Sequence, residues 1–212
     1  MSKLKQITKY HNDKKTVRCT YFLDANNQKQ GPYKSYYENG KVEKEGAFKN
    51  DEKSGNFTLY YPTGKIQALS HYKNGLLNGK VIWYYENGEK TISNYKNDVL
   101  NGKSIFYYGN GNLKGIYHFK NNNRHGGCKE FYEDGKLQEK CKYKDGILIG
   151  SYKQYNEDGK LTAKGKYKDG KRFGTIYTYE KGRISEIGII KNDKLVEVTE
   201  YWENGKVVKK TY

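Results

Sequence analysis

A glycine returns every 23 or 24 residues along almost the whole chain, in a short polar segment between two β-prone runs. These turn glycines are Gly40, Gly64, Gly88, Gly111, Gly135, Gly159, Gly182 and Gly205. Around Gly88, the runs 81–85 and 90–95 flank Asn87-Gly88. Asn-Gly between two such runs is typical of a type I′ hairpin, because both turn positions need a positive φ. The sequence therefore predicts an array of similar β-hairpins, each packed on its neighbours.

A second recurring glycine marks where each full unit begins. These opening glycines are Gly31, Gly55, Gly79, Gly102, Gly126, Gly150 and Gly174, with Glu197 at the same place in the last unit. The spacing predicts eight hairpin repeats in one continuous domain over residues 31–212. Residues 1–30 match one degenerate unit, in which Tyr10 corresponds to Tyr37 and Asp13 replaces the turn glycine. Because terminal repeats are commonly atypical, this segment is predicted to be an N-terminal capping repeat.

The composition excludes a thick buried core. Only 34% of the residues are apolar, against a usual 45–50%, whereas the chain has 23 tyrosines. Consecutive rings such as Tyr36-Tyr37 and Tyr60-Tyr61 must point to opposite faces of a strand, so both faces of the sheet carry aromatic side chains. A sandwich would alternate apolar and polar residues instead. We therefore expect an all-β fold, an elongated single-layer antiparallel β-meander of about sixteen strands with no helix, at two strands per hairpin.

A type I′ turn at Asn87-Gly88 sets a register in which Tyr85 faces Lys90 and Trp83 faces Ile92. The same rule gives one cross-strand column through the array: Tyr37 with Val42, Tyr61 with Ile66, Tyr108 with Leu113, Tyr132 with Leu137, Tyr179 with Ile184, and Trp202 with Val207. Together with Tyr85, these rings form the predicted structural ladder. Each aromatic–aliphatic pair is worth roughly 0.2–1 kcal/mol.

The same register places the opening glycines beneath rings. Gly31 faces Phe48 and Gly55 faces Tyr72, so a ring is expected to cover the backbone that a strand glycine would otherwise expose. No helix follows any of these glycines, which argues against phosphate-binding loops.

The three cysteines, Cys19, Cys128 and Cys141, are too few for a disulfide framework. The register places Cys128 opposite Cys141 in one hairpin, and we expect two small reduced core residues. The first residues are not followed by an apolar signal region, and no apolar run reaches the length of a membrane span. These features predict a cytoplasmic protein with no transmembrane segment.

The repeated pattern Gly-x-x-x-x-Tyr-Tyr-x-Asn-Gly-Lys-Leu/Val, followed by Tyr/Phe-Lys-Asn/Asp-Gly/Asp-x-x-x-Gly, resembles the MORN-repeat variant family, and in particular its bacterial YwqK-type members. The resemblance covers residues 31–212, with departures at Thr63, Lys181 and Glu197. It implies an elongated antiparallel β-meander. For many bacterial members it also implies a role as an antitoxin or immunity protein, which is an association carried by the family.

No pattern of catalytic residues is present, and we expect a protein that is not an enzyme and needs no cofactor. The four histidines are the only candidates for acid–base or metal chemistry: His11, His71, His118 and His125. His71 and His118 occupy equivalent places two repeats apart, about 19 Å at 4.8 Å per strand, so they cannot share a metal ion. The sequence predicts no catalytic and no metal site.

The net charge of +16 is compatible with an acidic protein, an anionic membrane surface or nucleic acid as partner. Two rows of lysine lie at the turns. The first is Lys49, Lys73, Lys96, Lys120, Lys144, Lys168 and Lys191, and the second is Lys41, Lys65, Lys136, Lys160 and Lys206. Lysines at sheet turns also guard against edge pairing. Nucleic acid is the less favoured partner, because no RNA-binding motif of known type occurs and these lysines fit the turns.

The leading hypothesis is a non-enzymatic antitoxin or immunity protein that neutralises a cognate toxin, with an acidic surface, by occlusion. The alternative is a scaffold that binds a peripheral anionic membrane surface through its lysine rows. Residues two and four places after the opening glycine vary most between repeats, so aromatic side chains there are candidate contacts. The predicted partner-binding residues are Phe57, Leu59, Tyr61, Trp83, Tyr85, Phe106, Tyr108, Lys73 and Lys96. Ordinary sheet packing is the competing explanation for the apolar members of this set.

Overall fold

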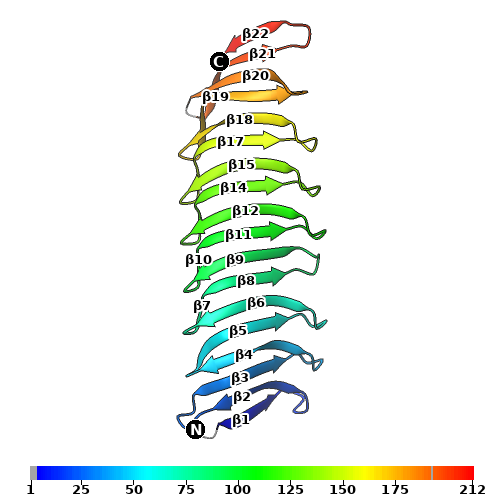
Figure 1. Ribbon diagram of the computed structural model, residues 1–212, viewed down its shortest axis with the longest axis vertical. Coiled ribbons are helices and arrows are strands. Elements are labelled where there is room, and N and C mark those ends of the chain that lie inside the picture. The colour runs from blue at the N-terminus through cyan, green and yellow to red at the C-terminus, as the bar shows by residue number, and fades with distance from the viewer. Residues whose placement is uncertain (1–3, 192) are drawn as a thin grey trace. The chain divides into compact units, whose positions relative to one another are not determined.

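The computed structural model describes residues 4–191 and 193–212, and every regular element in them is a β-strand (Figure 1). The chain forms two compact units, Met1–Asn101 and Gly102–Tyr212. The first unit contains β1 (Lys5–Tyr10), β2 (Val17–Leu23), β3 (Lys29–Tyr36), β4 (Val42–Lys49), β5 (Glu52–Tyr60), β6 (Ile66–Lys73), β7 (Leu76–Leu77), β8 (Gly79–Tyr84), β9 (Lys90–Lys96) and β10 (Val99–Leu100). The second contains β11 (Gly102–Tyr107), β12 (Leu113–Lys120), β13 (Asn123–Arg124), β14 (Gly126–Phe131), β15 (Leu137–Lys144), β16 (Ile147–Leu148), β17 (Gly150–Tyr155), β18 (Leu161–Lys168), β19 (Lys171–Glu180), β20 (Arg183–Lys191), β21 (Lys194–Tyr201) and β22 (Val207–Thr211).

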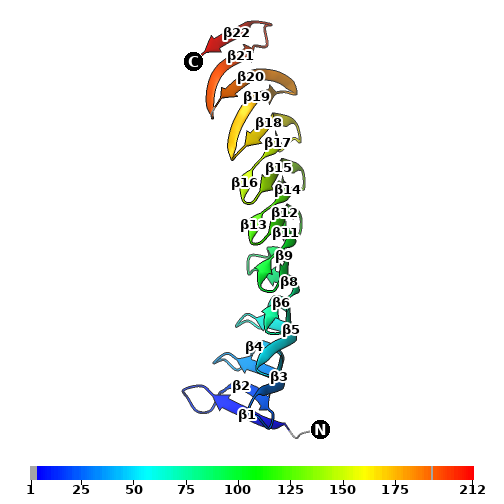
Figure 2. The ribbon, with the colours of Figure 1, turned by 90° about the vertical axis from the view of Figure 1, so that its left-hand side faces the viewer.

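Within each unit the strands follow one another in chain order and pair antiparallel with their neighbours (Figure 2). The predicted all-β meander of repeated hairpins is confirmed. The structure assigns 22 strands to the described residues rather than about sixteen. The additional ones are the N-terminal hairpin β1–β2 and the two-residue strands β7, β10, β13 and β16. Each of these short strands ends two residues before an opening glycine, where the next long strand begins.

The two kinds of turn have different geometries, and the type I′ prediction is wrong for Asn87-Gly88. The connections between hairpins carry positive φ at both central residues, for example 53° at Asn50 and 65° at Asp51, which defines a type I′ turn. At Asn87-Gly88 only the glycine has a positive φ, 85°. The Gly88 amide donates to the Tyr85 carbonyl at 3.0 Å, so this is a type I turn closed by a left-handed glycine, with a three-residue loop.

The longer loop changes the pairing next to the turn. Tyr84, not Tyr85, faces Lys90, and Trp83 faces Thr91 rather than Ile92. Elsewhere the ring opposite each aliphatic residue is the one before the predicted ring, as in Tyr60 with Ile66 and Phe131 with Leu137. The predicted cross-strand partners are therefore wrong for Tyr37, Tyr61, Tyr85, Tyr108, Tyr132 and Trp202. The pair Tyr179 with Ile184 is confirmed, because Lys181-Gly182 is a true type I′ turn.

The displaced ladder tyrosines have another role, which joins successive repeats. Each lies at a turn, and in four of them the hydroxyl donates to a main-chain carbonyl 23 residues further on. The contacts are Tyr37 to Tyr60 at 2.6 Å, and Tyr61 to Tyr84, Tyr108 to Phe131 and Tyr132 to Tyr155 at 2.7 Å each. Because the acceptor is main chain, the contact depends on the position of the next repeat and not on its side chain.

The opening glycines sit at β-bulges. Gly55 pairs with Tyr72 as predicted, but a Cβ at Gly55 would meet nothing within 4 Å, so no ring covers it. Its φ of 75° lies in the left-handed region, which explains the glycine. The ring that covers a glycine is found elsewhere: Phe57 lies over Gly46, where ring carbons would come within 2.6 Å of an added Cβ. Ring cover of strand glycines is therefore real but was assigned to the wrong positions.

In each unit, much of the buried core is a column formed by the residue two places after each opening glycine and its cross-strand partner, while other buried residues, such as Ser35 and Ala68, lie outside this column. Most pairs join a large residue to a small one: Tyr33 with Gly46, Phe57 with Ser70, Val81 with Ser93, Tyr152 with Gly165 and Ile176 with Gly188. Ser104 with Tyr117 has the reverse order, and the buried Ser104 hydroxyl has no hydrogen-bond partner. A large residue on one strand is thus accommodated by a small one opposite it.

Cys128 and Cys141 occupy this column and face each other as predicted. Their side chains are 3% and 6% exposed, and they are joined by a disulfide with the Cα atoms 5.2 Å apart. The expectation of two reduced cysteines is therefore not met, while Cys19 is free. The bridge packs against Tyr152 at the centre of an apolar cluster in the second unit.

Candidate binding surfaces

The predicted partner-binding set divides between core and surface. Phe57 is only 1% exposed and packs edge-to-face on Phe48 and Tyr72, with ring centroids 5.8 and 5.1 Å apart. It belongs to the core, and its prediction as a contact residue is wrong. Leu59 and Trp83, in contrast, are both half-buried and both face Ala68, on three adjacent strands. These three residues form a contiguous apolar row, which we call the Trp83 row.

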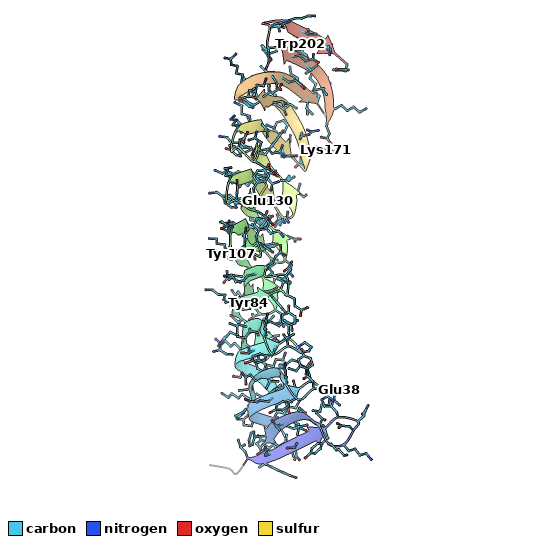
Figure 3. The ribbon with its side chains drawn as sticks, turned by 90° about the vertical axis from the view of Figure 1, so that its right-hand side faces the viewer. Glu38, Tyr84, Tyr107, Glu130, Lys171 and Trp202 are labelled. Atoms are coloured by element: carbon cyan, nitrogen blue, oxygen red, sulfur yellow. A yellow bond between two sulfur atoms is a disulfide. The ribbon has the colours of Figure 1, made fainter. Side chains whose placement is uncertain are left out.

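The other aromatic members are spread over turns and over both units. Tyr61 is half-buried and its hydroxyl is used by the main-chain contact described above, whereas Tyr85 is 47% exposed. Phe106 and Tyr108 belong to the second unit, where Phe106 packs edge-to-face on Tyr117 at 5.3 Å. Tyr84 and Tyr107 are labelled in Figure 3 and end β8 and β11, respectively.

The lysines at the turns form two rows that differ in their contacts. Those of the first row are all exposed: Lys49, Lys73 and Lys96 in the first unit, and Lys120, Lys144, Lys168 and Lys191 in the second. Lysines of the second row help to join repeats. The Lys41 ammonium donates to the Thr63 carbonyl at 2.8 Å, and that of Lys136 to the Glu157 carbonyl at 2.6 Å. The first row is thus exposed along its whole length and could meet an anionic partner.

Other cations are held against the aromatic core. The Lys53 ammonium lies 4.5 Å from the Tyr72 ring centroid and 5.4 Å from that of Phe57. In the second unit the Arg124 guanidinium lies 4.5 Å from the ring of Tyr117. Such contacts stabilise a cation over a ring by about 0.5–1 kcal/mol at exposed sites. We assign these residues to packing.

The structure shows a further set of lysines, in the middle of strands, that the sequence analysis missed. Lys129 faces Lys140, Lys140 faces Lys153, and Lys153 faces Lys164, on β14, β15, β17 and β18. We call these residues the lysine ladder. A lysine three places after both Gly126 and Gly150 is the sequence pattern that could have predicted this ladder. The pattern can be recognised only when the strands of successive hairpins are aligned with one another.

The carboxylates of the same strands lie on the opposite face. Glu130 of β14, labelled in Figure 3, faces Glu139 of β15 and accepts a hydrogen bond from the Tyr117 hydroxyl at 2.7 Å. Burial, reinforced by the charge of Glu130, raises the pKa of Glu139 above its usual value. Burial and the hydrogen bond to Glu130 together raise the pKa of Tyr117, which remains protonated. Positive and negative side chains are thus segregated between the two faces.

A cleft of about 470 Å³ opens beside the last hairpin of the second unit and is lined by Tyr201, Trp202, Glu200 and Glu203, among others. Trp202 is 53% exposed and lies at the turn after β21 (Figure 3). The two carboxylates are already neutralised, Glu203 by Lys181 and Glu200 by Lys210. The cleft is therefore an open surface hollow with paired charges.

Over residues 4–191 and 193–212, no group of three or more His, Cys, Asp or Glu side chains could hold a metal ion. In that part of the chain, no helix is long and apolar enough to cross a membrane.

These features define the class of β-hairpin repeat proteins. The sequence matches the MORN repeat variant family at residues 29–50, 53–74, 77–97, 100–121, 124–145, 148–169 and 194–212, and the chain belongs to this family. The matches do not include residues 170–193, which hold one of the eight predicted repeats. MORN repeats indicate a repeat-based binding scaffold.

No curated protein matches the sequence. Among solved structures, a porin-like protein from Bacteroides uniformis ATCC 8492 matches over 97% of this chain and 93% of that chain, with 11% identity and a TM-score of 0.23. A likeness at this level carries no argument about fold or function.

Proposed function

We propose that this chain is a non-enzymatic bacterial antitoxin or immunity protein that binds a cognate toxin and neutralises it by occlusion. The observation that carries the proposal is the Trp83 row, in which the half-buried Trp83 and Leu59 flank Ala68, which is 1% exposed. Interface hot spots are enriched in such aromatic anchors with a polar surround. The exposed lysines Lys73 and Lys96, at turns of the same hairpins, favour a partner with an acidic surface.

The test begins with a pull-down from the native host, with the wild-type chain and Trp83→Ala as baits. Any recovered protein is then expressed with and without this chain, and its toxicity is measured. We expect Trp83→Ala to weaken association by about 2 kcal/mol or more, as a central aromatic anchor does, and to abolish protection. Trp202→Ala is the matched control, because it removes an exposed tryptophan from the second unit.

The lysines are tested separately by charge reversal at Lys73 and Lys96. Charges at an interface rim mainly steer encounter, so the association rate and its salt dependence should both fall while dissociation changes little. Reversal of Lys144 and Lys168, in the second unit, is the control. If the toxin binds the Trp83 variant as tightly as wild type, the Trp83 row is not the interface and the proposal fails.

An anionic membrane is the alternative partner for the first lysine row, because Lys49, Lys73 and Lys96 are all exposed at equivalent turns. A basic residue near such a surface contributes about 1 kcal/mol. Sedimentation with phosphatidylserine vesicles, abolished by reversal of the three lysines and unaffected by Trp83→Ala, would favour this scaffold function over toxin binding.

A further inference from the structure

The lysine ladder places like charges directly opposite one another. Directly opposed like charges in a sheet are destabilising, and neighbouring strands lie about 4.8 Å apart. Four lysines therefore extend over about 14 Å of sheet with an ammonium on every strand. Lys129, Lys140 and Lys153 are exposed, so water reduces the repulsion but does not remove it. An anionic ligand along the ladder would turn this cost into attraction.

The surrounding face adds positive charge. Lys142 and Lys166 follow Lys140 and Lys164 by two residues, and so lie on the same face of β15 and β18. The four strands of the ladder contain only two carboxylates, Glu130 and Glu139, which lie on the opposite face. No acidic side chain of these strands can neutralise the ladder.

Aromatic rings border the ladder. Phe131 follows Lys129 by two residues on β14, Tyr155 follows Lys153 by two on β17, and both rings are half-buried. At the far end of the ladder, the Lys164 ammonium lies 4.3 Å from the ring centroid of Tyr177. Rows of cations and of partly exposed rings thus run side by side across the strands.

A hollow of about 290 Å³ opens on the near end of this face, lined by Ile116, Gly127, Lys129 and Lys140, among others. Gly127 adds no side chain to it, and the space beside its Cα is open, since a Cβ added there would meet nothing within 4 Å. Ile116 gives the hollow an apolar wall, and the ammonium groups of Lys129 and Lys140 lie at its border. An apolar wall beside positive charge suits a flat ring that is attached to an anionic group.

We propose that this face of the second unit binds single-stranded nucleic acid. The lysine ladder follows the phosphates, and Phe131, Tyr155 and the hollow at Gly127 accept bases. Single-strand binding surfaces combine a basic track with aromatic side chains on which bases stack. A duplex hides its base faces, and a carboxylate-rich protein or a membrane would need the charges but not the rings beside them. Lysines lack the bidentate geometry that reads bases, so binding tolerates many sequences.

The experiment uses the full chain and a fluorescein-labelled oligouridylate of about 20 nucleotides, long enough to cross several strands. Affinity is measured by fluorescence anisotropy over a range of salt concentrations. The logarithm of affinity should fall linearly with the logarithm of salt concentration. Replacing Lys129, Lys140, Lys153 and Lys164 by Gln should weaken binding and flatten this slope by up to about three units, since each phosphate contact contributes about 0.7.

The matched control replaces four exposed turn lysines of the same unit, Lys120, Lys144, Lys168 and Lys191, by Gln. Both variants lose the same charge, but only the first loses the ladder. A loss confined to the ladder variant supports the proposal, and equal losses overturn it because net charge alone would then explain binding. Circular dichroism checks that both variants are folded, and the pair Lys140→Gln, Lys153→Gln replaces the fourfold variant if it is not.

Base contacts are tested by Phe131→Leu with Tyr155→Leu, and by Gly127→Leu, which fills the hollow. Base stacking on a ring is worth roughly a 5- to 150-fold change in affinity, so both variants should weaken oligouridylate binding. Binding of polyglutamate and of phosphatidylserine vesicles should be unchanged by these variants and weaker than that of the oligonucleotide. If polyglutamate or the vesicles bind more tightly, the face serves an acidic protein or a membrane and the proposal is wrong.

Discussion

The hydroxyl of Tyr108 donates a hydrogen bond of 2.7 Å to the main-chain carbonyl of Phe131, one repeat further along the chain. Tyr132 makes the same contact with Tyr155. A repeat is therefore tied to its successor by a side chain at the turn as well as by the strand ladder. The donor is a ladder residue of the sequence analysis, but its partner is a carbonyl and not an aliphatic side chain.

Removing this hydroxyl should have a small and defined cost. Tyr108→Phe loses one hydrogen bond and should lower the free energy of unfolding by about 0.5–1.5 kcal/mol. Tyr108→Ala also loses the packing of the ring and should cost about 2–4 kcal/mol. Urea unfolding measures both. Tyr201→Phe, at a residue that is 41% exposed, should change nothing, and equal losses at the two tyrosines would contradict the role of the hydroxyl.

Phe57 should behave as a core residue. Phe57→Ala would open a cavity over Gly46 and should cost about 3–5 kcal/mol in the free energy of unfolding. Leu59→Ala, in the half-buried Trp83 row, should cost clearly less. If Phe57 were a surface contact residue, Phe57→Ala would cost little stability. A larger loss of stability for Leu59→Ala than for Phe57→Ala would therefore refute the assignment of Phe57 to the core.

The opening glycines are explained by backbone conformation, which a pair of substitutions can isolate. Gly150 has a φ of 69° and Gly127 has no positive φ, while a Cβ at either would meet nothing within 4 Å. Gly150→Ala should therefore lower stability by about 1–2 kcal/mol, and Gly127→Ala should be neutral or slightly stabilising. Thermal unfolding of both variants measures the difference in stability. Equal changes in melting temperature would show that the positive φ is not the reason for glycine at residue 150.

The disulfide between Cys128 and Cys141 should determine how many thiols react and how a reductant changes the stability of the chain. The oxidised chain should show one reactive thiol, Cys19, rather than three. The loop between Cys128 and Cys141 spans 13 residues, so reduction should cost about 2–3 kcal/mol. Cys19→Ser should have the same melting temperature as the wild-type chain, both when the two are compared without reductant and when they are compared with it. Three free thiols in the untreated, folded chain would mean that the bridge does not form.

Glu139 should make stability depend on pH. Its pKa is raised in the folded chain, chiefly by burial and also by Glu130, so ionisation opposes folding. Stability from this group is present below its usual pKa of 4.5 and is lost as the pH rises through the raised value. Glu139→Gln should therefore raise the melting temperature at neutral pH, on the order of 1–3 °C, and the gain should vanish in acid. Glu133→Gln, at the exposed turn of the same hairpin, is the control.

The sequence predicted the hairpin array well because its signals are local. The period of the turn glycines marks each hairpin. The predicted pairing of Cys128 with Cys141 is correct because a register shift between Glu130 and Phe131 offsets the longer loop. The error at Trp83 arose because Asn-Gly fits both a type I′ turn and a type I turn closed by a left-handed glycine.

Surfaces were harder to predict than hairpins, because burial depends on the bulges. Phe57 and Leu59 have similar sequence contexts, but the bulge at Gly55 brings only Phe57 over Gly46. The lysine ladder was missed for a related reason. Its members face one another across two successive hairpins, and their alignment depends on the bulge at Gly150 between them.

The constant offset of 23 residues in the tyrosine contacts also bears on how the chain is synthesised. Every acceptor carbonyl is made after its donor tyrosine, and by the time it leaves the ribosome the preceding hairpin is already complete. Each new hairpin can therefore dock on a folded predecessor without waiting for the C-terminus, since contacts local in sequence need little loop closure. The same offset makes one repeat the natural unit of gain or loss in evolution, because inserting or deleting a whole repeat restores every tyrosine–carbonyl pair.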